Sequence, residues 1–342
     1  LRIMRKKTLS VMLGAAMAAS LLSGCGGSSK PADVTTAAPA ATTAAPAADT
    51  TAAPEADTEA PAADAASSDD LIVVGYAQVG AESDWRTANT ESFKSTFTEE
   101  NGYKLIFDDA QQKQENQIKA IRSFIQQDVD YIVVAPVVET GWEAVLQEAQ
   151  EAGIPVILSD RMMDVDESLY ECWVGGNFIK EGETAGNWLA DYLKAQGRDG
   201  EDINIVTLQG TIGASAQVGR TEGFGNILKQ HDNWKMLDMQ TGEFTQAKGQ
   251  EVMESMLKQY DNINVVYCEN DNEAFGAIEA IKAAGKTVGP DGDILVMSFD
   301  TTKQGITDTL SGDIIVNTEC NPLHGPRVEQ IIKQLQAGET PE

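Results

Sequence analysis

The chain has 342 residues, with 25 Lys and Arg against 53 Asp and Glu, which gives a formal net charge of −28 at pH 7. Such an acidic chain is repelled by nucleic-acid phosphates and by anionic lipid surfaces. This excludes nucleic acid as a partner and favours a neutral or cationic ligand.

The N-terminal segment has the pattern of a secretory signal peptide, because basic residues precede an apolar run from Leu9 to Leu22. The run is too short for a membrane-spanning helix. It ends in Leu22-Ser23-Gly24-Cys25, which resembles the lipobox of bacterial lipoproteins, where cleavage leaves the Cys as the lipid-carrying N-terminus. We therefore predict a signal peptide over residues 1–24, lipid (palmitate) attachment at Cys25, and an extracytoplasmic location anchored to the cell membrane.

Residues 25–70 are mostly Ala, Thr, Pro and acidic residues, with almost nothing large and apolar. Such a segment cannot bury enough apolar surface to offset the entropy lost on folding. Five of the 11 prolines lie here, which favours extended conformations. We predict a disordered tether between the lipid anchor and a globular part.

From residue 71 onward, short apolar runs alternate with amphipathic helix patterns, which predicts strands alternating with helices. The pattern restarts after Gly175-Gly176-Asn177, so each half is expected to be an α/β, doubly wound parallel sheet. In the first half, strands are predicted at 71–75, 104–107, 131–135, 154–158 and 170–174, with helices at 85–101, 118–125 and 141–152. In the second half, strands are predicted at 203–208, 235–239, 264–268, 294–299 and 314–318, with helices at 179–195, 217–230, 246–259, 272–284, 303–310 and 324–336.

Polar and aromatic side chains recur where the predicted strands end, which is where open α/β sheets bind ligands. Planar Asp, Asn and Arg groups can each engage two sugar hydroxyls, and an aromatic face can cover the C–H side of a sugar ring. The candidate sugar-binding set is Arg86, Asp160, Arg161, Arg220, Asn270, Asp300 and Glu319, with Trp85 and Phe244. Asp109 and Asn272 are interpreted instead as helix-cap or turn residues.

The remaining reactive residue types give no enzyme or metal signature. Cys172, Cys268 and Cys320 are widely spaced and odd in number, so we expect free, buried thiols and neither a disulfide framework nor a zinc site. His231 and His324 are predicted on helical stretches away from strand ends. No nucleophile elbow or phosphate loop has the required spacing.

Six segments resemble the sugar receptors of the type I periplasmic-binding-protein family, ribose/galactose class, which are the solute-binding components of ABC importers. The similarity covers residues 72–326. The segments are VGAESDWR (79–86), QQKQENQIKA (111–120), APVVETGW (135–142), SDR (159–161), LQGTIGAS (208–215) and KGQEVMES (248–255).

This resemblance implies two lobes joined by three crossovers, near 175–177, 300–301 and 318–319. The N-terminal lobe would comprise 71–175 plus 301–318, and the C-terminal lobe 176–300 plus 319–342. A monosaccharide, galactofuranose or a related aldose, would be enclosed by a monomer that delivers it to an ABC permease, with no cofactor and no metal. The implied sugar contacts are Glu82, Ser83, Asp84, Trp85, Arg86, Asp160, Arg161, Arg220, Asn270 and Asp300, with Phe244 and Glu319.

Two other functions stay open at this point. A sugar-sensing accessory receptor, for chemotaxis or a sensor kinase, would share the fold and the site. A carbohydrate-active enzyme would use Asp160, Asp300 or Glu319 as acid and base, since paired carboxylates permit that chemistry.

Overall fold

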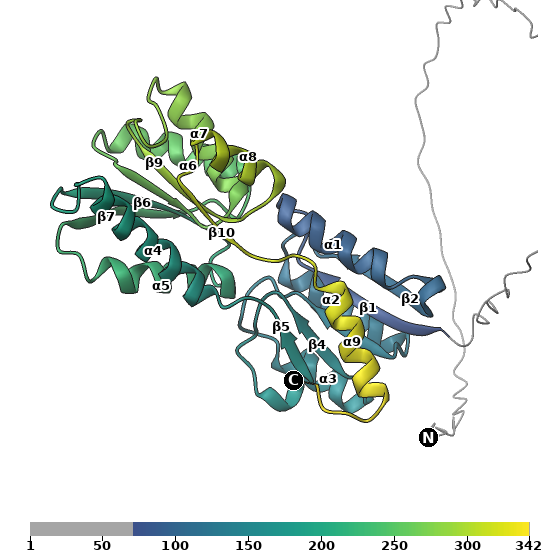
Figure 1. The fold of residues 1–342 in the computed structure, drawn as a ribbon. Coiled ribbons are helices and arrows are strands. Elements are labelled where there is room, and N and C mark those ends of the chain that lie inside the picture. The colour runs from purple at the N-terminus through teal and green to yellow at the C-terminus, as the bar shows by residue number, and fades with distance from the viewer. Residues whose placement is uncertain (1–70, 342) are drawn as a thin grey trace, which may run out of the picture. The chain divides into compact units, whose positions relative to one another are not determined.

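The computed structural model describes residues 71–341, which form two five-stranded parallel sheets surrounded by helices (Figure 1). The predicted signal peptide, the tether and Cys25 lie outside the described residues. Within 71–341, none of the helices combines the length and apolarity needed to cross a lipid bilayer.

The first sheet has the strand order β2-β1-β3-β4-β5, all parallel. Helices α1 and α9 cover one face, where Phe93 and Ile331 pack on Tyr76, and α2 and α3 cover the other, where Phe124 and Leu146 pack on Ile132. The elements are β1 (Ile72–Gln78), α1 (Asp84–Thr96), β2 (Tyr103–Asp109), α2 (Gln114–Gln126), β3 (Tyr131–Val134), α3 (Glu143–Ala152), β4 (Val156–Ser159), β5 (Cys172–Val174) and α9 (Gly325–Gln336), with 3-10 turns at Glu99–Asn101 and Glu167–Leu169.

The second sheet has the order β10-β9-β8-β6-β7, again all parallel. Helices α4 and α5 pack on one face through Leu189 and Phe224, and α6 and α7 pack on the other through Met253 and Ile281. The elements are α4 (Phe178–Ala195), β6 (Ile203–Gln209), α5 (Ser215–Leu228), β7 (Trp234–Thr241), α6 (Gln246–Gln259), β8 (Val265–Cys268), α7 (Asp271–Ala283), β9 (Leu295–Asp300), α8 (Lys303–Ser311) and β10 (Val316–Glu319).

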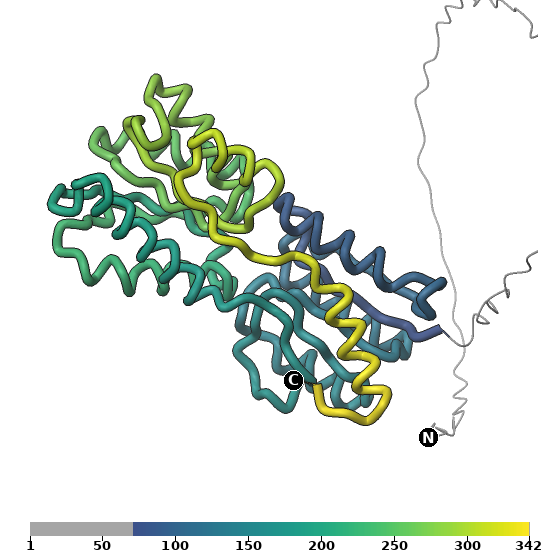
Figure 2. Tube along the Cα trace, in the orientation of Figure 1, coloured from purple at the N-terminus to yellow at the C-terminus, as the bar shows by residue number. Residues whose placement is uncertain are grey.

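The predicted fold class is confirmed, because both halves are doubly wound parallel sheets, but the expected exchange of the last segments between lobes is wrong. Strand β10 pairs with β9, with Val316 opposite Met297, so residues 301–318 belong to the second sheet. Helix α9 packs with α1 on the first sheet, so the last helix belongs to the first lobe (Figure 2). In the structure, β9, α8 and β10 form one β-α-β unit, whose two parallel strands lie in the same sheet.

Within the described residues, the chain therefore changes sheet twice, between β5 and α4 and between β10 and α9 (Figure 2). The crossover expected at 300–301 does not occur there, because Asp300 and Thr301 lie inside the second lobe. The other lobe boundaries stay predictions.

Helices α4 and α5 approach each other closely because glycines line their contact. A Cβ added at Gly223 would lie 2.1 Å from the carbonyl oxygen of Ile179, and one at Gly182 would lie 2.5 Å from that of Arg220. Only glycine permits backbones to pack at this distance. The close contact places Phe178, at the start of α4, beside the turn of α5 that carries Arg220.

This packing predicts opposite effects of the same substitution at two positions of α5. Gly223→Ala should lower the free energy of unfolding by roughly 1–3 kcal/mol, because the methyl group forces the helices apart. Gly225→Ala, where an added Cβ meets nothing within 4 Å, should raise it by about 0.5–1 kcal/mol, because Ala favours the helix. Urea unfolding of both variants measures the difference, and equal effects would contradict the close helix contact.

Candidate functional site

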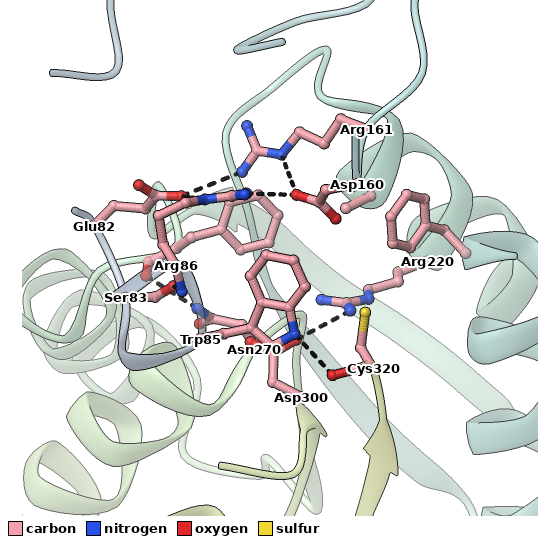
Figure 3. Close-up of a pocket in the computed structure, with 13 residues that line it drawn as sticks. Glu82, Ser83, Trp85, Arg86, Asp160, Arg161, Arg220, Asn270, Asp300 and Cys320 are labelled. Carbon is pink, nitrogen blue, oxygen red and sulfur yellow. Dashed lines mark hydrogen bonds and ion pairs between the residues drawn. The ribbon is translucent and has the colours of Figure 1, made fainter. Parts of the chain in front are cut away.

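A small cavity lies where the strands of both sheets end. Ten of the twelve predicted ligand-binding residues line it. The full lining is Glu82, Ser83, Trp85, Arg86, Asp160, Arg161, Phe178, Ala216, Arg220, Phe244, Asn270, Asp300 and Cys320 (Figure 3).

The beginning of α1 carries the first group of lining residues. Ser83 is the N-cap, and its hydroxyl accepts a hydrogen bond from the backbone N–H of Arg86 at 3.1 Å. This cap fixes the first turn of α1. Trp85 and Arg86 therefore lie side by side beyond the carboxyl end of β1, and both are buried.

Two aspartates sit at strand ends in left-handed backbone conformations. Asp160, directly after β4, has φ 64°, and Asp300, at the end of β9, has φ 94°. Asp is among the few residue types that adopt this region at modest cost. The turn directs each carboxylate toward the cavity instead of along the strand (Figure 3).

The first lobe contributes a buried network of two cations and two carboxylates. Arg86 donates from NH2 to Asp160 Oδ2 at 2.6 Å and from Nε to Glu82 Oε1 at 3.0 Å, and Arg161 NH2 lies 3.6 Å from the same Glu82 oxygen. Burial favours the neutral form of Asp160, but Arg86 and Arg161 outweigh it and hold the pKa of this carboxyl below its ordinary value. Burial and the Arg86 charge lower the pKa of Arg161 to about 10.

The second lobe repeats this arrangement around Arg220, on α5. Its NH2 donates to Asp300 Oδ1 at 3.1 Å, its Nε donates to Glu181 Oε2 at 2.9 Å, and its NH1 donates to the carbonyl of Glu269. Burial raises the pKa of Asp300 to about 7, although the Arg220 charge opposes the shift. The two lobes thus offer one carboxylate with a low pKa and one that titrates near neutrality.

Aromatic faces complete the lining. Phe244 lies under the Arg161 guanidinium, whose Cζ is 5.1 Å from the ring centroid, and Trp85 lies under Arg86 at 4.8 Å. The indole N–H of Trp85 donates to the carbonyl of Cys320 at 2.7 Å, so its polar edge is already bonded. A ligand can therefore meet the indole only through its apolar ring atoms.

Three polar atoms of the lining residues are buried without a hydrogen-bond partner. They are Glu82 Oε2, Arg86 NH1 and Arg161 Nε. Buried polar groups in folded proteins are bonded in the large majority of cases, so a cluster of exceptions requires a reason. Both donors and acceptors are free here, which matches a ligand whose hydroxyl groups donate and accept.

Two predicted residues are not brought to the cavity. Asp84 and Glu319 are exposed and do not line it. The backbone N–H of Asp84 donates to Asn272 Oδ1 at 3.0 Å, so Asn272 joins the two lobes, whereas the cap of α7 is Asn270. Asp109 accepts from the backbone N–H of Gln111 at 2.8 Å, which is the turn role predicted for it.

Sequence reasoning missed several residues of the site region. Phe178, Ala216 and Cys320 line the cavity. The expectation that His324 lies away from strand ends is wrong: its Nδ1 is 3.1 Å from Ser159 Oγ, at the end of β4, and its ring meets Trp85 edge-on at 5.9 Å. In the sequence, Phe178 could have been identified as a site residue by its position directly after the Gly175-Gly176-Asn177 junction.

Hydrogen bonds between the lobes surround the cavity. The backbone N–H of Glu139 donates to the Gly213 carbonyl at 2.9 Å, and that of Met162 donates to Ser215 Oγ at 2.9 Å. With the bond between Asp84 and Asn272, three such contacts start from main-chain N–H groups of the first lobe. The structure is therefore a closed arrangement of the two lobes.

Residues 71–341 contain no group of three or more His, Cys, Asp or Glu placed to hold a metal ion. Cys172, Cys268 and Cys320 are free thiols, and Cys172 is half-buried, unlike the other two.

Two parallel-sheet lobes closed around a small polar cavity define a ligand-binding receptor. Residues 74–318 match the family described as periplasmic binding protein domain, and the chain belongs to this family. The predicted resemblance is thereby confirmed.

Relatives of known function narrow the class. The chain is 45% identical over 276 residues to the galactofuranose-binding protein YtfQ of Escherichia coli (strain K12), covering 79% of this chain and 84% of the relative. A structure from Mycobacterium smegmatis in complex with β-D-fucofuranose is 47% identical, with TM-score 0.75, covering 79% and 88% of the two chains. The binding protein of the arabinose ABC transporter from Shewanella sp. ANA-3, bound to α- and β-L-arabinofuranose, is 44% identical, with TM-score 0.73, covering 79% and 87%.

The high pKa of Asp300 predicts a pH dependence of stability. Its pKa is 3.8 ordinarily and about 7 in the folded chain, so the folded state binds more protons between these values and stability falls as pH rises through them. Because Asn does not titrate, Asp300→Asn should remove roughly 2–4 kcal/mol of the stability that the parent loses over this pH range. The melting temperature of the ligand-free variant should therefore fall less steeply than the parent's between about pH 4 and 7. The exposed Asp261→Asn serves as control, and parallel curves for Asp300→Asn and parent would contradict the shift.

Proposed function

We propose that this chain is the extracytoplasmic sugar-binding component of an ABC importer and that it encloses one monosaccharide, galactofuranose or a related aldose in its furanose form. The observation that carries the proposal is the cluster of unpartnered buried atoms on Glu82, Arg86 and Arg161, which a polyhydroxylated ligand would satisfy. The furanoses named for the three relatives support the ring form.

The charges of the cavity suit a neutral ligand. Three guanidinium groups face the carboxyl groups of Glu82, Asp160 and Asp300, so charged groups of both signs line the cavity. In the proposed complex, the aromatic faces cover the C–H side of the sugar, and charged groups of both lobes bond its hydroxyls. The proposed contacts are Glu82, Ser83, Trp85, Arg86, Asp160, Arg161, Arg220, Phe244, Asn270 and Asp300.

The geometry argues against the enzyme alternative. Asp160 and Asp300 each pair with an arginine, and Glu319, the third candidate acid or base, is exposed outside the cavity. The close relatives are sugar-binding transport proteins. A sensing role would use the same fold and site and would differ in the partner that receives the closed form.

We also propose where the protein is located and which partner it serves. The lipobox-like Leu22-Ser23-Gly24-Cys25 supports a lipid anchor at Cys25, and the composition of 25–70 supports a tether that spaces the lobes from the membrane. We further propose that the protein acts as a monomer and delivers its sugar to a membrane permease.

Asp160→Asn should weaken sugar affinity by about ten- to hundredfold, because a hydrogen bond to a charged group contributes roughly 1.5–3 kcal/mol. Asn tolerates the left-handed backbone at this position, and circular dichroism checks that the variant still folds, because Arg86 loses the carboxylate with which it pairs. Isothermal titration calorimetry with L-arabinose, D-fucose and D-galactose measures the change.

Asp84→Asn and Glu319→Gln provide the matched comparison, because the sequence predicts both as contacts and the structure leaves both outside the cavity. We expect each to bind within about twofold of the parent, as surface changes do. A large loss at either position, or none at Asp160, would place the sugar elsewhere. Failure of the parent to bind any sugar would refute the proposal.

Cys25→Ser should release the protein from the membrane, because lipid attachment needs the thiol. Fractionation of cells that express the full chain should find the parent in the membrane fraction and the variant in the soluble extracytoplasmic fraction. An unchanged distribution would exclude Cys25 as the anchor.

A further inference from the structure

Phe244 is held over the cavity in an unusual backbone conformation. Glu243 and Phe244 have φ values of 56° and 61°, two consecutive left-handed residues of which neither is glycine. A bulky residue adopts this region only where its surroundings enforce it. The ring is buried, and it stacks under Arg161 of the opposite lobe.

The side chains that hold Phe244 in this backbone conformation come from the start of α7. Asn270 donates from Nδ2 to the carbonyl of Phe244 at 3.0 Å, and Glu273 Oε1 accepts from the backbone N–H of Phe244 at 3.0 Å. Both polar groups of the Phe244 main chain are thus bonded by two residues three positions apart.

The sequence pattern alone suggests a different role for Glu273. Asn270 is the N-cap of α7 and accepts from the N–H of Glu273 at 2.8 Å, which is half of a capping box. In a capping box the Glu side chain would reach back to the N–H of the cap residue. Here the carboxyl instead bonds the strained loop, and its second oxygen, Oε2, is buried without a partner.

Space around the two side chains is equally restricted. A Cβ added at Gly210 would lie 1.9 Å from the Phe244 ring, and one at Gly242 would lie 2.7 Å from Glu273 Oε1. The ring and the carboxyl each occupy a position that only a glycine neighbour leaves free.

We infer that Glu273, a residue outside the cavity, is the positioning residue that holds Phe244 over the sugar and so sets the affinity of the site. The inference rests on the proposed function for its sugar, but the geometry of the loop does not. Burial, reinforced by the nearby Glu269 carboxylate, raises the pKa of Glu273. The carboxyl bonds the Phe244 N–H through an acceptor oxygen, which the amide oxygen of Gln reproduces.

The test combines Glu273→Met, Glu273→Gln, Phe244→Ala and the double variant Glu273→Met/Phe244→Ala, with the exposed Asp261→Asn as control. Affinity for L-arabinose, D-fucose and D-galactose is measured by calorimetry, and hydrogen exchange of residues 241–246 is measured on the ligand-free chain. Circular dichroism checks folding. Should Glu273→Met not fold, Gly242→Ala displaces the same carboxyl.

Glu273→Met should weaken binding by roughly tenfold, since the buried N–H of Phe244 loses its acceptor. It should also speed exchange at that amide, whereas Glu273→Gln should stay close to the parent in both measurements. In the Phe244→Ala background, Glu273→Met should add less than about twofold, because coupled residues lose additivity.

If Glu273→Met lowers the sugar affinity equally in the parent and in the Phe244→Ala background, Glu273 is a structural residue that does not act through Phe244. Parent-like affinity and parent-like hydrogen exchange in Glu273→Met would overturn the inference. A parent that binds none of the sugars would sink the proposed function, and the exchange data would still decide the role of Glu273.

Discussion

The constraint on which this structure depends is the burial of guanidinium groups. Removing a charge from water costs several kcal/mol, so a buried arginine requires a partner carboxylate in good geometry. Arg86 on α1 finds Asp160 after β4, and Arg220 on α5 finds Asp300 at the end of β9. Each pair joins two elements of one lobe. The binding groups are therefore fixed before a ligand arrives, which lowers the entropy cost of binding.

The same region concentrates backbone strain. Asp160, Asp300, Thr301 and Phe244 all have positive φ values, and all lie at or just beyond strand ends. Regular strands would send these residues on along the sheet, whereas the left-handed turns bring the side chains of Asp160, Asp300 and Phe244 to the cavity. Left-handed residues other than glycine persist only where packing and hydrogen bonds determine them fully. The compact helical layers around both sheets supply that support.

The fold was predictable because its signals are local. Apolar runs such as 71–75 and amphipathic patterns such as 118–125 are read from neighbouring residues, and the position of Asp160 and Asp300 after buried strands identified them as cavity residues. The lobe assignment of the last segments was not predictable in this way, since it depends on which strand β10 pairs with. That choice is made by tertiary contacts rather than by composition.

The errors at the site have the same origin. Asp84 and Arg86 are separated by one residue on α1, and only the direction of the helix decides that Arg86 enters the cavity while Asp84 faces solvent. His324 follows β10 by five residues in the chain but meets Ser159 only because α9, which begins after His324, packs on the first sheet. Glu273 carries an ordinary cap pattern whose carboxyl is redirected by a loop some 30 residues earlier.

The contacts that close the lobes have a consequence for how such a receptor can diverge. Three of them begin at main-chain N–H groups, those of Asp84, Glu139 and Met162. A main-chain donor persists when the side chain on the same residue is replaced, except by proline. Mutation can therefore alter the residues that face the ligand while the closing contacts remain. Ligand preference and closure are separable traits in this architecture, which leaves selectivity free to evolve on an unchanged set of closing contacts.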